Sequence, residues 1–171
     1  ITLTHNSEGL VTQAEDGCGN RAVLTYGSDG TLTGLTTPDG YTTHYTYDEY
    51  ARITSGTDGE EVCYFKDSYD SLGRIIKQED AQSGVTYFEY DDSACDGTTT
   101  VTVTDREGGV KSYVYSPLKQ LLSETDQNGN TVRYTYDSEG RLAAVTDAAG
   151  NSVIKEYTED GLLKTQTASD G

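Results

Sequence analysis

Methionine and tryptophan are absent from this sequence of 171 residues, phenylalanine occurs only twice, and hydrophobic residues make up 33% of the chain. So few large apolar side chains argue against a conventional, deeply packed core. No apolar run is long enough for a membrane-spanning helix, and no signal segment is recognisable. The missing initiator methionine suggests a piece of a longer protein, so the lack of a signal says nothing about export of the parent chain.

Positive charge is also scarce, because 12 basic side chains face 29 acidic ones and the formal net charge is −17. A surface of this sign repels phosphate backbones and anionic lipid headgroups. Nucleic acids and membrane surfaces are therefore not expected as partners.

Cysteine and histidine are too few and too scattered to suggest a reactive site. The three cysteines, Cys18, Cys63 and Cys95, are an odd number with no CxxC pair. They predict free thiols, with one disulfide plus a leftover thiol as the alternative, and a zinc site is not expected. His5 and His44 are the only histidines, and no Ser/Cys–His–Asp arrangement is recognisable. We expect neither enzymatic activity nor a cofactor.

Tyrosine and glycine are abundant, with 14 and 19 residues, and they recur in a repeated segment. The segments 45–53, 67–75 and 134–142 align on their second aromatic or its equivalent, which we call the anchor. Most anchors are 21 residues apart, while four extra residues between two of them fall in a longer loop at 91–97. The pattern predicts a single array over residues 1–171, with about eight units anchored on His5, Tyr26, Tyr47, Tyr69, Tyr90, Tyr115, Tyr136 and Tyr157.

Four further columns follow the anchors. The glycine four residues after the anchor recurs at Gly30, Gly73, Gly140 and Gly161, with Ala51 and Lys119 as exceptions. An aliphatic residue six positions after it recurs at Leu32, Ile53, Ile75, Leu121, Leu142 and Leu163. A second glycine fourteen positions after most anchors recurs at Gly19, Gly40, Gly129, Gly150 and Gly171. Arginine recurs five positions after the anchor at Arg52, Arg74 and Arg141.

Each unit has the pattern of a β-hairpin. Alternation in Val132–Tyr136 places alternate side chains on one face of a strand, and the residues from Asp137 to Gly140 suit a tight turn. The return strand 141–146 ends at a second turn, 147–151. A lone hairpin of this composition buries too little surface to be stable, so neighbours must supply the rest. We expect an all-β fold: tandem hairpins in one continuous, twisted, coiled antiparallel sheet, as a solenoid or an open shell segment.

The unit Gly129–Leu142 resembles the tyrosine–aspartate (YD, or Rhs) repeat, with its G-N…Y-x-Y-D-x-x-G-R-L pattern. The resemblance implies a β-sheet that spirals into a hollow shell. Such shells enclose a toxic C-terminal payload in bacterial Rhs proteins and in the C component of Tc toxins, and teneurins use a similar shell at animal cell surfaces. Wall-associated proteins carry the repeat outside the cell, and carbohydrate binding has been attached to it. No segment here matches the self-cleavage site of shell-forming members, so we do not expect autoproteolysis.

The resemblance favours a structural scaffold from a secreted or cell-surface bacterial protein, whose partners are the rest of its parent chain and a payload domain. The alternative is an extracellular module that binds a glycan or a protein through exposed tyrosines or the loop 91–97. Self-association through open sheet edges is a third alternative. The Asp-rich turns also suit calcium, although turns need the same residues for their own hydrogen bonds. The arginines are expected to form a ladder on one sheet face, paired with neighbouring Asp and Glu.

Overall fold

The computed structural model describes residues 1–169, and this range contains strands and turns but no helix, and therefore none that is long and apolar enough to cross a membrane. The residues form two compact units, Ile1–Thr86 and a second that begins at Tyr87. The first unit contains β1 (Thr2–His5), β2 (Val11–Glu15), β3 (Arg21–Tyr26), β4 (Leu32–Thr36), β5 (Thr42–Tyr47), β6 (Ile53–Asp58), β7 (Cys63–Tyr69) and β8 (Ile75–Asp80). The second contains most of β9 (Val85–Asp91) and all of β10 (Thr99–Thr104), β11 (Val110–Tyr115), β12 (Leu121–Thr125), β13 (Thr131–Tyr136), β14 (Leu142–Thr146), β15 (Ser152–Tyr157) and β16 (Leu163–Ser169).

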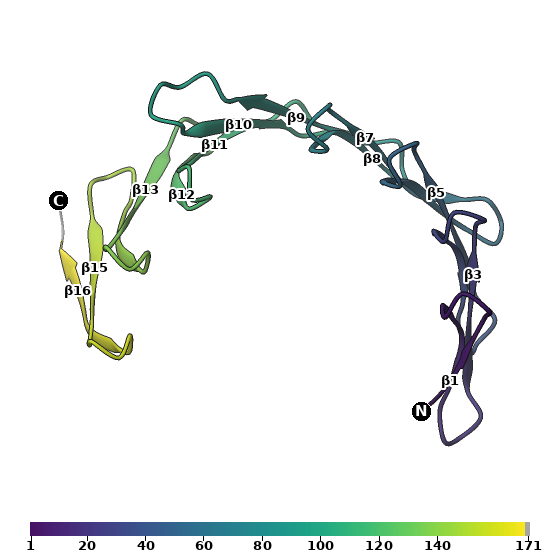
Figure 1. The fold of residues 1–171 in the computed structure, drawn as a ribbon. Coiled ribbons are helices and arrows are strands. Elements are labelled where there is room, and N and C mark those ends of the chain that lie inside the picture. Colours follow the sequence, from purple (N-terminus) through teal and green to yellow (C-terminus); the bar gives the residue numbers. More distant parts are fainter. Residues whose placement is uncertain (170–171) are drawn as a thin grey trace. The chain divides into compact units, whose positions relative to one another are not determined.

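Within each unit, every strand pairs antiparallel with the strand that follows it in the chain (Figure 1). The order is β1 to β8 in the first unit and β9 to β16 in the second. Apart from the longer loop between β9 and β10, consecutive strands are joined by short turns, which is the connection that antiparallel neighbours permit. The predicted all-β fold of antiparallel hairpins is confirmed.

A β-bulge recurs at the anchors. Tyr136 lies opposite Leu142, whereas Thr135 lies opposite Ala144, so Ala143 has no partner on the other strand. This extra residue places the anchor directly across from the aliphatic column, and the two side chains share one face. The same register shift occurs at His5, Tyr26, Tyr47, Tyr69, Tyr115 and Tyr157.

The two faces of the strands differ, but neither face is deeply buried. In β13, Val132, Tyr134 and Tyr136 are half-buried, whereas Arg133 and Thr135 are exposed. The described residues contain no buried hydrophobic side chain. Each hairpin therefore depends on its neighbours in the sheet rather than on a central core.

Buried backbone occurs where a neighbouring side chain covers a glycine. A Cβ added to Gly56 would lie 2.5 Å from Cε1 of Phe65, which is its partner on the adjacent strand. The Phe65 ring therefore covers the space that the glycine leaves open, and a larger residue at position 56 would displace it.

Candidate functional site

The anchor tyrosines connect consecutive hairpins through their hydroxyl groups. The hydroxyl of Tyr136 donates to the carbonyl oxygen of Leu121, at 2.9 Å, and Leu121 belongs to the aliphatic column of the preceding hairpin. The half-buried ring thus packs within its own hairpin while its hydroxyl reaches the one before. The same bond, at 2.5–2.9 Å, joins Tyr26 to Val11, Tyr47 to Leu32, Tyr69 to Ile53 and Tyr157 to Leu142.

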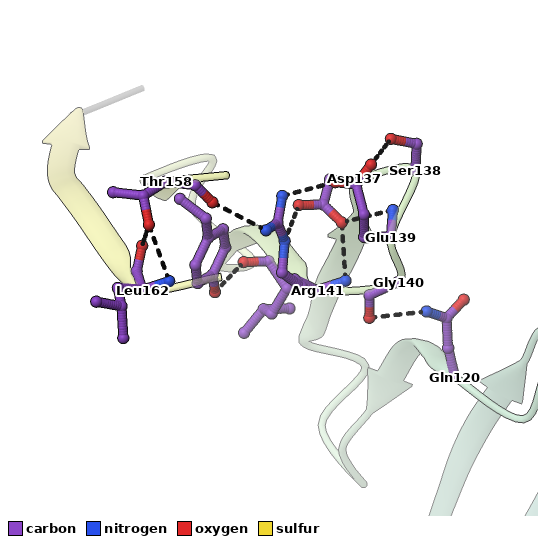
Figure 2. Close-up of polar contacts among 10 residues, drawn as sticks. Gln120, Asp137, Ser138, Glu139, Gly140, Arg141, Thr158 and Leu162 are labelled. Atoms are coloured by element: carbon purple, nitrogen blue, oxygen red, sulfur yellow. Dashed lines mark hydrogen bonds and ion pairs between the residues drawn. The ribbon is translucent and has the colours of Figure 1, made fainter. Parts of the chain in front are cut away.

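Aspartate directly follows four anchors, at Asp48, Asp70, Asp91 and Asp137, and we call these residues the Asp column. Asp137 and Arg141 hold the turn after Tyr136 (Figure 2). Oδ1 of Asp137 accepts the backbone N–H groups of Glu139 and Arg141, at 3.1 and 2.9 Å. Oδ2 accepts the side-chain Nε–H of Arg141 at 2.7 Å. Gly140 has a φ of +80°, a left-handed conformation that glycine adopts at no steric cost. The Asp, Gly and Arg columns therefore act together within one turn.

Two turns of the first unit share this arrangement. Nε of Arg52 lies 2.7 Å from Oδ2 of Asp48, and Nε of Arg74 lies 2.7 Å from Oδ2 of Asp70. The backbone N–H of Arg74 donates to Asp70 and lowers the pKa of that carboxyl, and this effect outweighs partial desolvation, which acts in the opposite direction. These carboxylates favour their charged form because the turn surrounds them with donors.

The same guanidinium groups also reach the following hairpin. Nη1 of Arg141 donates to the carbonyl of Thr158 at 3.3 Å, and its Cζ lies 4.8 Å from the ring centroid of Tyr157. Arg52 lies 4.7 Å from the ring centroid of Tyr69 in the corresponding way, and its Nη1 donates to the backbone carbonyl of the next turn at 3.0 Å. Arg52 and Arg141 therefore each join a turn, the next turn and the next anchor.

Arg52, Arg74 and Arg141 were expected to form a ladder on one sheet face, paired with neighbouring Asp and Glu. Each pairs with the aspartate four residues earlier in its own turn, and Arg141 also pairs with Glu139 at 2.6 Å. The reason is local, because a turn places residues i and i+4 side by side.

The second turn of the hairpin repeats the same design with asparagine in place of arginine. Oδ1 of Asp126 accepts the backbone N–H groups of Asn128 and Asn130, at 2.9 and 2.8 Å, and Oδ2 accepts the side-chain amide of Asn130 at 2.9 Å. Asp-x-x-Gly-Asn is thus the counterpart of Asp-x-x-Gly-Arg, a likeness that the sequence analysis missed although both patterns are visible in the sequence. The amide-to-carboxylate bond recurs in the pairs Asn20–Asp16 and Asn151–Asp147.

A calcium site would need the oxygens of the turn aspartates as ligands. These oxygens accept hydrogen bonds within their own turns. The side-chain amide of Asn130 lowers the pKa of Asp126, as expected for a carboxylate that accepts several hydrogen bonds. No group of three or more His, Cys, Asp or Glu side chains in the described residues is arranged to hold a metal ion.

Positive φ values mark both glycine columns. Gly30, Gly73 and Gly161 have φ of +82°, +81° and +81°. Ala51 and Lys119 adopt the same conformation, with φ of 59° and 63°, although they carry side chains. The second column behaves alike at Gly19, Gly40, Gly129 and Gly150, while Gly171 lies outside the described residues.

The remaining candidate residues lie apart from one another. His5 is exposed at the end of β1, across from Val11. The three cysteines are free thiols, and Cys18 and Cys95 are exposed. Tyr90 and Tyr115 end β9 and β11, as the repeat requires, and the other members of the aliphatic column, Ile75 and Leu163, begin β8 and β16.

The long loop joins β9 to β10. Asp91, the last residue of β9, accepts the backbone N–H of Ser93 at 2.9 Å, and a turn closes between Ala94 and Gly97. A Cβ at Gly97 would lie 3.2 Å from Cγ of Pro117, so the loop lies against the following turn. The insertion therefore lengthens one turn and leaves the strand pairing on either side in register.

Comparison with known proteins gives one family match. Residues 115–152 match the RHS Repeat family. No curated protein shows significant sequence similarity to the chain.

Several solved structures show a distant likeness. The TcdB2–TccC3–TEV crystal structure is 15% identical, with a TM-score of 0.40, over 95% of this chain and 12% of that one. The Photorhabdus luminescens Tc holotoxin pore with the TccC3-D651A mutation gives the same values. A porin-like protein from Bacteroides uniformis is 12% identical, with a TM-score of 0.41, over 97% of this chain and 86% of that one. The chain spans about an eighth of the length of the Tc polypeptides.

The family match covers the hairpins in which the anchor Tyr136, the turn aspartate Asp137 and Arg141 form the bonds described above. The same bonds recur in the first unit around Tyr47 and Tyr69. Residues 115–152 are therefore similar to the RHS (YD) repeat, and the same contacts occur outside the matched segment.

Proposed function

We propose that this scaffold is a segment of wall in a larger secreted or cell-surface bacterial protein, whose shell encloses a C-terminal, toxin-like payload. Its partners are then the remaining repeats of the parent chain and the enclosed domain. The array of about eight units over residues 1–171 supplies the wall, and the anchors, the aliphatic column and the turn glycines have architectural roles rather than catalytic ones.

The observation that carries this proposal is the use of the tyrosine hydroxyls. In five hairpins the anchor hydroxyl donates to a backbone carbonyl of the preceding hairpin. A column used in this way at successive units favours a role in building the sheet over a role in recognising a ligand, because binding sites are few per protein. Net charge of −17 also favours a soluble surface.

The wall function is tested in the parent polypeptide by removing residues 116–157, which are two whole periods between the anchors Tyr115 and Tyr157. The deletion keeps the repeat register while shortening the wall. We expect the C-terminal part of the parent to become sensitive to protease, whereas the parent carrying Ser138→Ala stays protected. A C-terminal part that is digested equally fast in the unaltered parent contradicts the proposal, as do single-particle images without a hollow shell.

A further inference from the structure

Glu124 is a carboxylate on the tyrosine-bearing face of the sheet and not in a turn. Glu124, in β12, is paired with Tyr113 on one side and with Val132 on the other. It stands nine residues after its anchor, a position that carries no charge in six other hairpins. Those equivalents are Ala14, Leu35, Gly56, Gln78, Val145 and Gln166.

Glu124 has one oxygen bonded and one available. Its Oε1 accepts the hydroxyl proton of Tyr134 at 2.7 Å, and this hydrogen bond raises the pKa of Tyr134 to about 12. Within the described residues, no Lys or Arg nitrogen lies within ion-pair distance of Glu124. A half-buried carboxylate in this state has lost part of its hydration without gaining a positive partner.

The carboxylate opens into a hollow of about 250 Å³. Tyr113, Val132 and Asn130 line it together with Glu124, so it offers an aromatic ring, an aliphatic wall and an amide. Asp126 also lines it, but both of its oxygens are used in its own turn. Glu124 therefore offers the hollow a charged oxygen, Oε2, that accepts no hydrogen bond within its own turn or strand pair.

Elsewhere in the chain, the group that pairs with a carboxylate beside a tyrosine ring is the guanidinium of an arginine. Arg141 pairs with Asp137 at 2.7 Å and lies over the ring of Tyr157 at 4.8 Å. Arg52 combines a carboxylate and a tyrosine ring in the same manner. Guanidinium suits such a place because its plane stacks on a ring while its edge donates to oxygen.

We propose that the hollow at Glu124 binds an arginine side chain of a partner protein, with the guanidinium stacked on Tyr113 and donating to Glu124. The net charge of −17 attracts a cationic segment toward the chain. Lys111 also lines the hollow and opposes this charge, so its removal strengthens binding. The site is independent of the wall function.

The test is an NMR titration of the purified chain at low ionic strength with two blocked amino acids, N-acetylarginine amide and N-acetylcitrulline amide. Citrulline has the shape of arginine without its charge. We expect the arginine probe to shift the backbone amides of Tyr113, Glu124 and Val132, and the citrulline probe to leave them in place. Glu124→Gln should weaken arginine binding at least about tenfold. Glu159→Gln, which removes an exposed acid of the same unit, should not.

Two further variants test the proposal if the Glu124→Gln variant does not fold. Tyr113→Leu keeps the carboxylate and should weaken binding several-fold, while Lys111→Ala should strengthen it. Equal shifts with citrulline, or arginine binding that is unchanged by both Glu124→Gln and Tyr113→Leu, would overturn the proposal. The first result would point to a neutral polar ligand and the second to an arginine site elsewhere.

Discussion

Two successive hairpins of the second unit carry the same turn with different side chains, at 116–120 and 137–141. The backbone N–H of Ser116 donates to the carbonyl of Gln120 at 2.8 Å, and that of Asp137 donates to the carbonyl of Arg141 at 2.9 Å. In both turns the fourth residue has a positive φ, although Lys119 fills that place in the first. The backbone path is thus common to both turns.

The two turns differ in their side chains. Asp137 accepts three hydrogen bonds inside its turn, whereas Ser116 accepts one, from the backbone N–H of Gln120 at 3.1 Å. Gln120 still reaches the next turn, where its amide donates to the carbonyl of Gly140 at 3.2 Å (Figure 2). It does so without the ion pair and the ring contact of Arg141. The shared backbone path is thus sufficient to form the hairpin turn, and the Asp and Arg columns add contacts that strengthen the junction between one hairpin and the next.

The largest effect should follow from removing an anchor. Tyr136→Ala deletes the ring opposite Leu142 and the hydroxyl bond to Leu121, and we expect it to lower the free energy of unfolding by about 2–3 kcal/mol. Ser138→Ala, at an exposed turn position, should change it by less than about 0.5 kcal/mol. Urea denaturation followed by circular dichroism measures both. Equal midpoints for the two variants would contradict the anchor role.

A smaller change removes only the hydroxyl group of an anchor, and it can be compared between the successive anchors Tyr115 and Tyr136. Tyr136→Phe removes the bond to Leu121 and should cost about 1 kcal/mol. Tyr115 makes no such bond in the described part of the chain, so Tyr115→Phe should be nearly neutral. The pair is measured by the same denaturation. A Tyr115→Phe variant that loses as much stability would break the distinction between the two junctions.

The weaker turn can also be converted into the stronger one. The double substitution Ser116→Asp and Gln120→Arg supplies the missing carboxylate and guanidinium, with the ring of Tyr136 as the stacking partner. We expect a gain of roughly 0.5–1 kcal/mol that shrinks in 1 M salt, because exposed ion pairs are screened. Gln120→Arg alone is the control, since it lacks the carboxylate. A gain that does not depend on salt would show that packing, rather than charge, causes the difference in stability between the two turns.

The smallest expected effect concerns the glycine column. Lys119 holds a left-handed conformation, with φ of 63°, so Lys119→Gly relieves strain while adding freedom to the unfolded chain. We expect a net gain of about 0.5 kcal/mol in the unfolding free energy. Glu139→Gly, one turn later at a position that needs no positive φ, should instead be destabilising. Thermal melts of the two variants check the sign.

The repeat itself could be found in the sequence, because tyrosine, aspartate and glycine recur at fixed spacing. Alternation in segments such as Val132–Tyr136 predicted strands, and glycine with aspartate predicted tight turns. The match of 115–152 to the RHS Repeat family and the all-β hairpins agree with that analysis. These features are local, so the order of residues along the chain is sufficient to specify them.

The partners of the side chains could not be found in this way. Arg141 was expected to pair with a neighbouring Asp or Glu, and only the structure identifies Asp137 in its own turn as the partner and brings Tyr157 of the next hairpin to it. Glu124 was not singled out, because only the pairing of β11, β12 and β13 places it between Tyr113 and Val132.

The sequence by itself determined the hairpin repeat and the residues that build it, since turn chemistry and strand alternation act over a few residues. Only the tertiary structure decided that the anchor hydroxyls reach back about fifteen residues, that the arginines reach forward to the next anchor, and that Glu124 faces a hollow. Register is the physical reason. A bulge of one residue decides which side chains share a face and which carbonyl lies within reach of a hydroxyl.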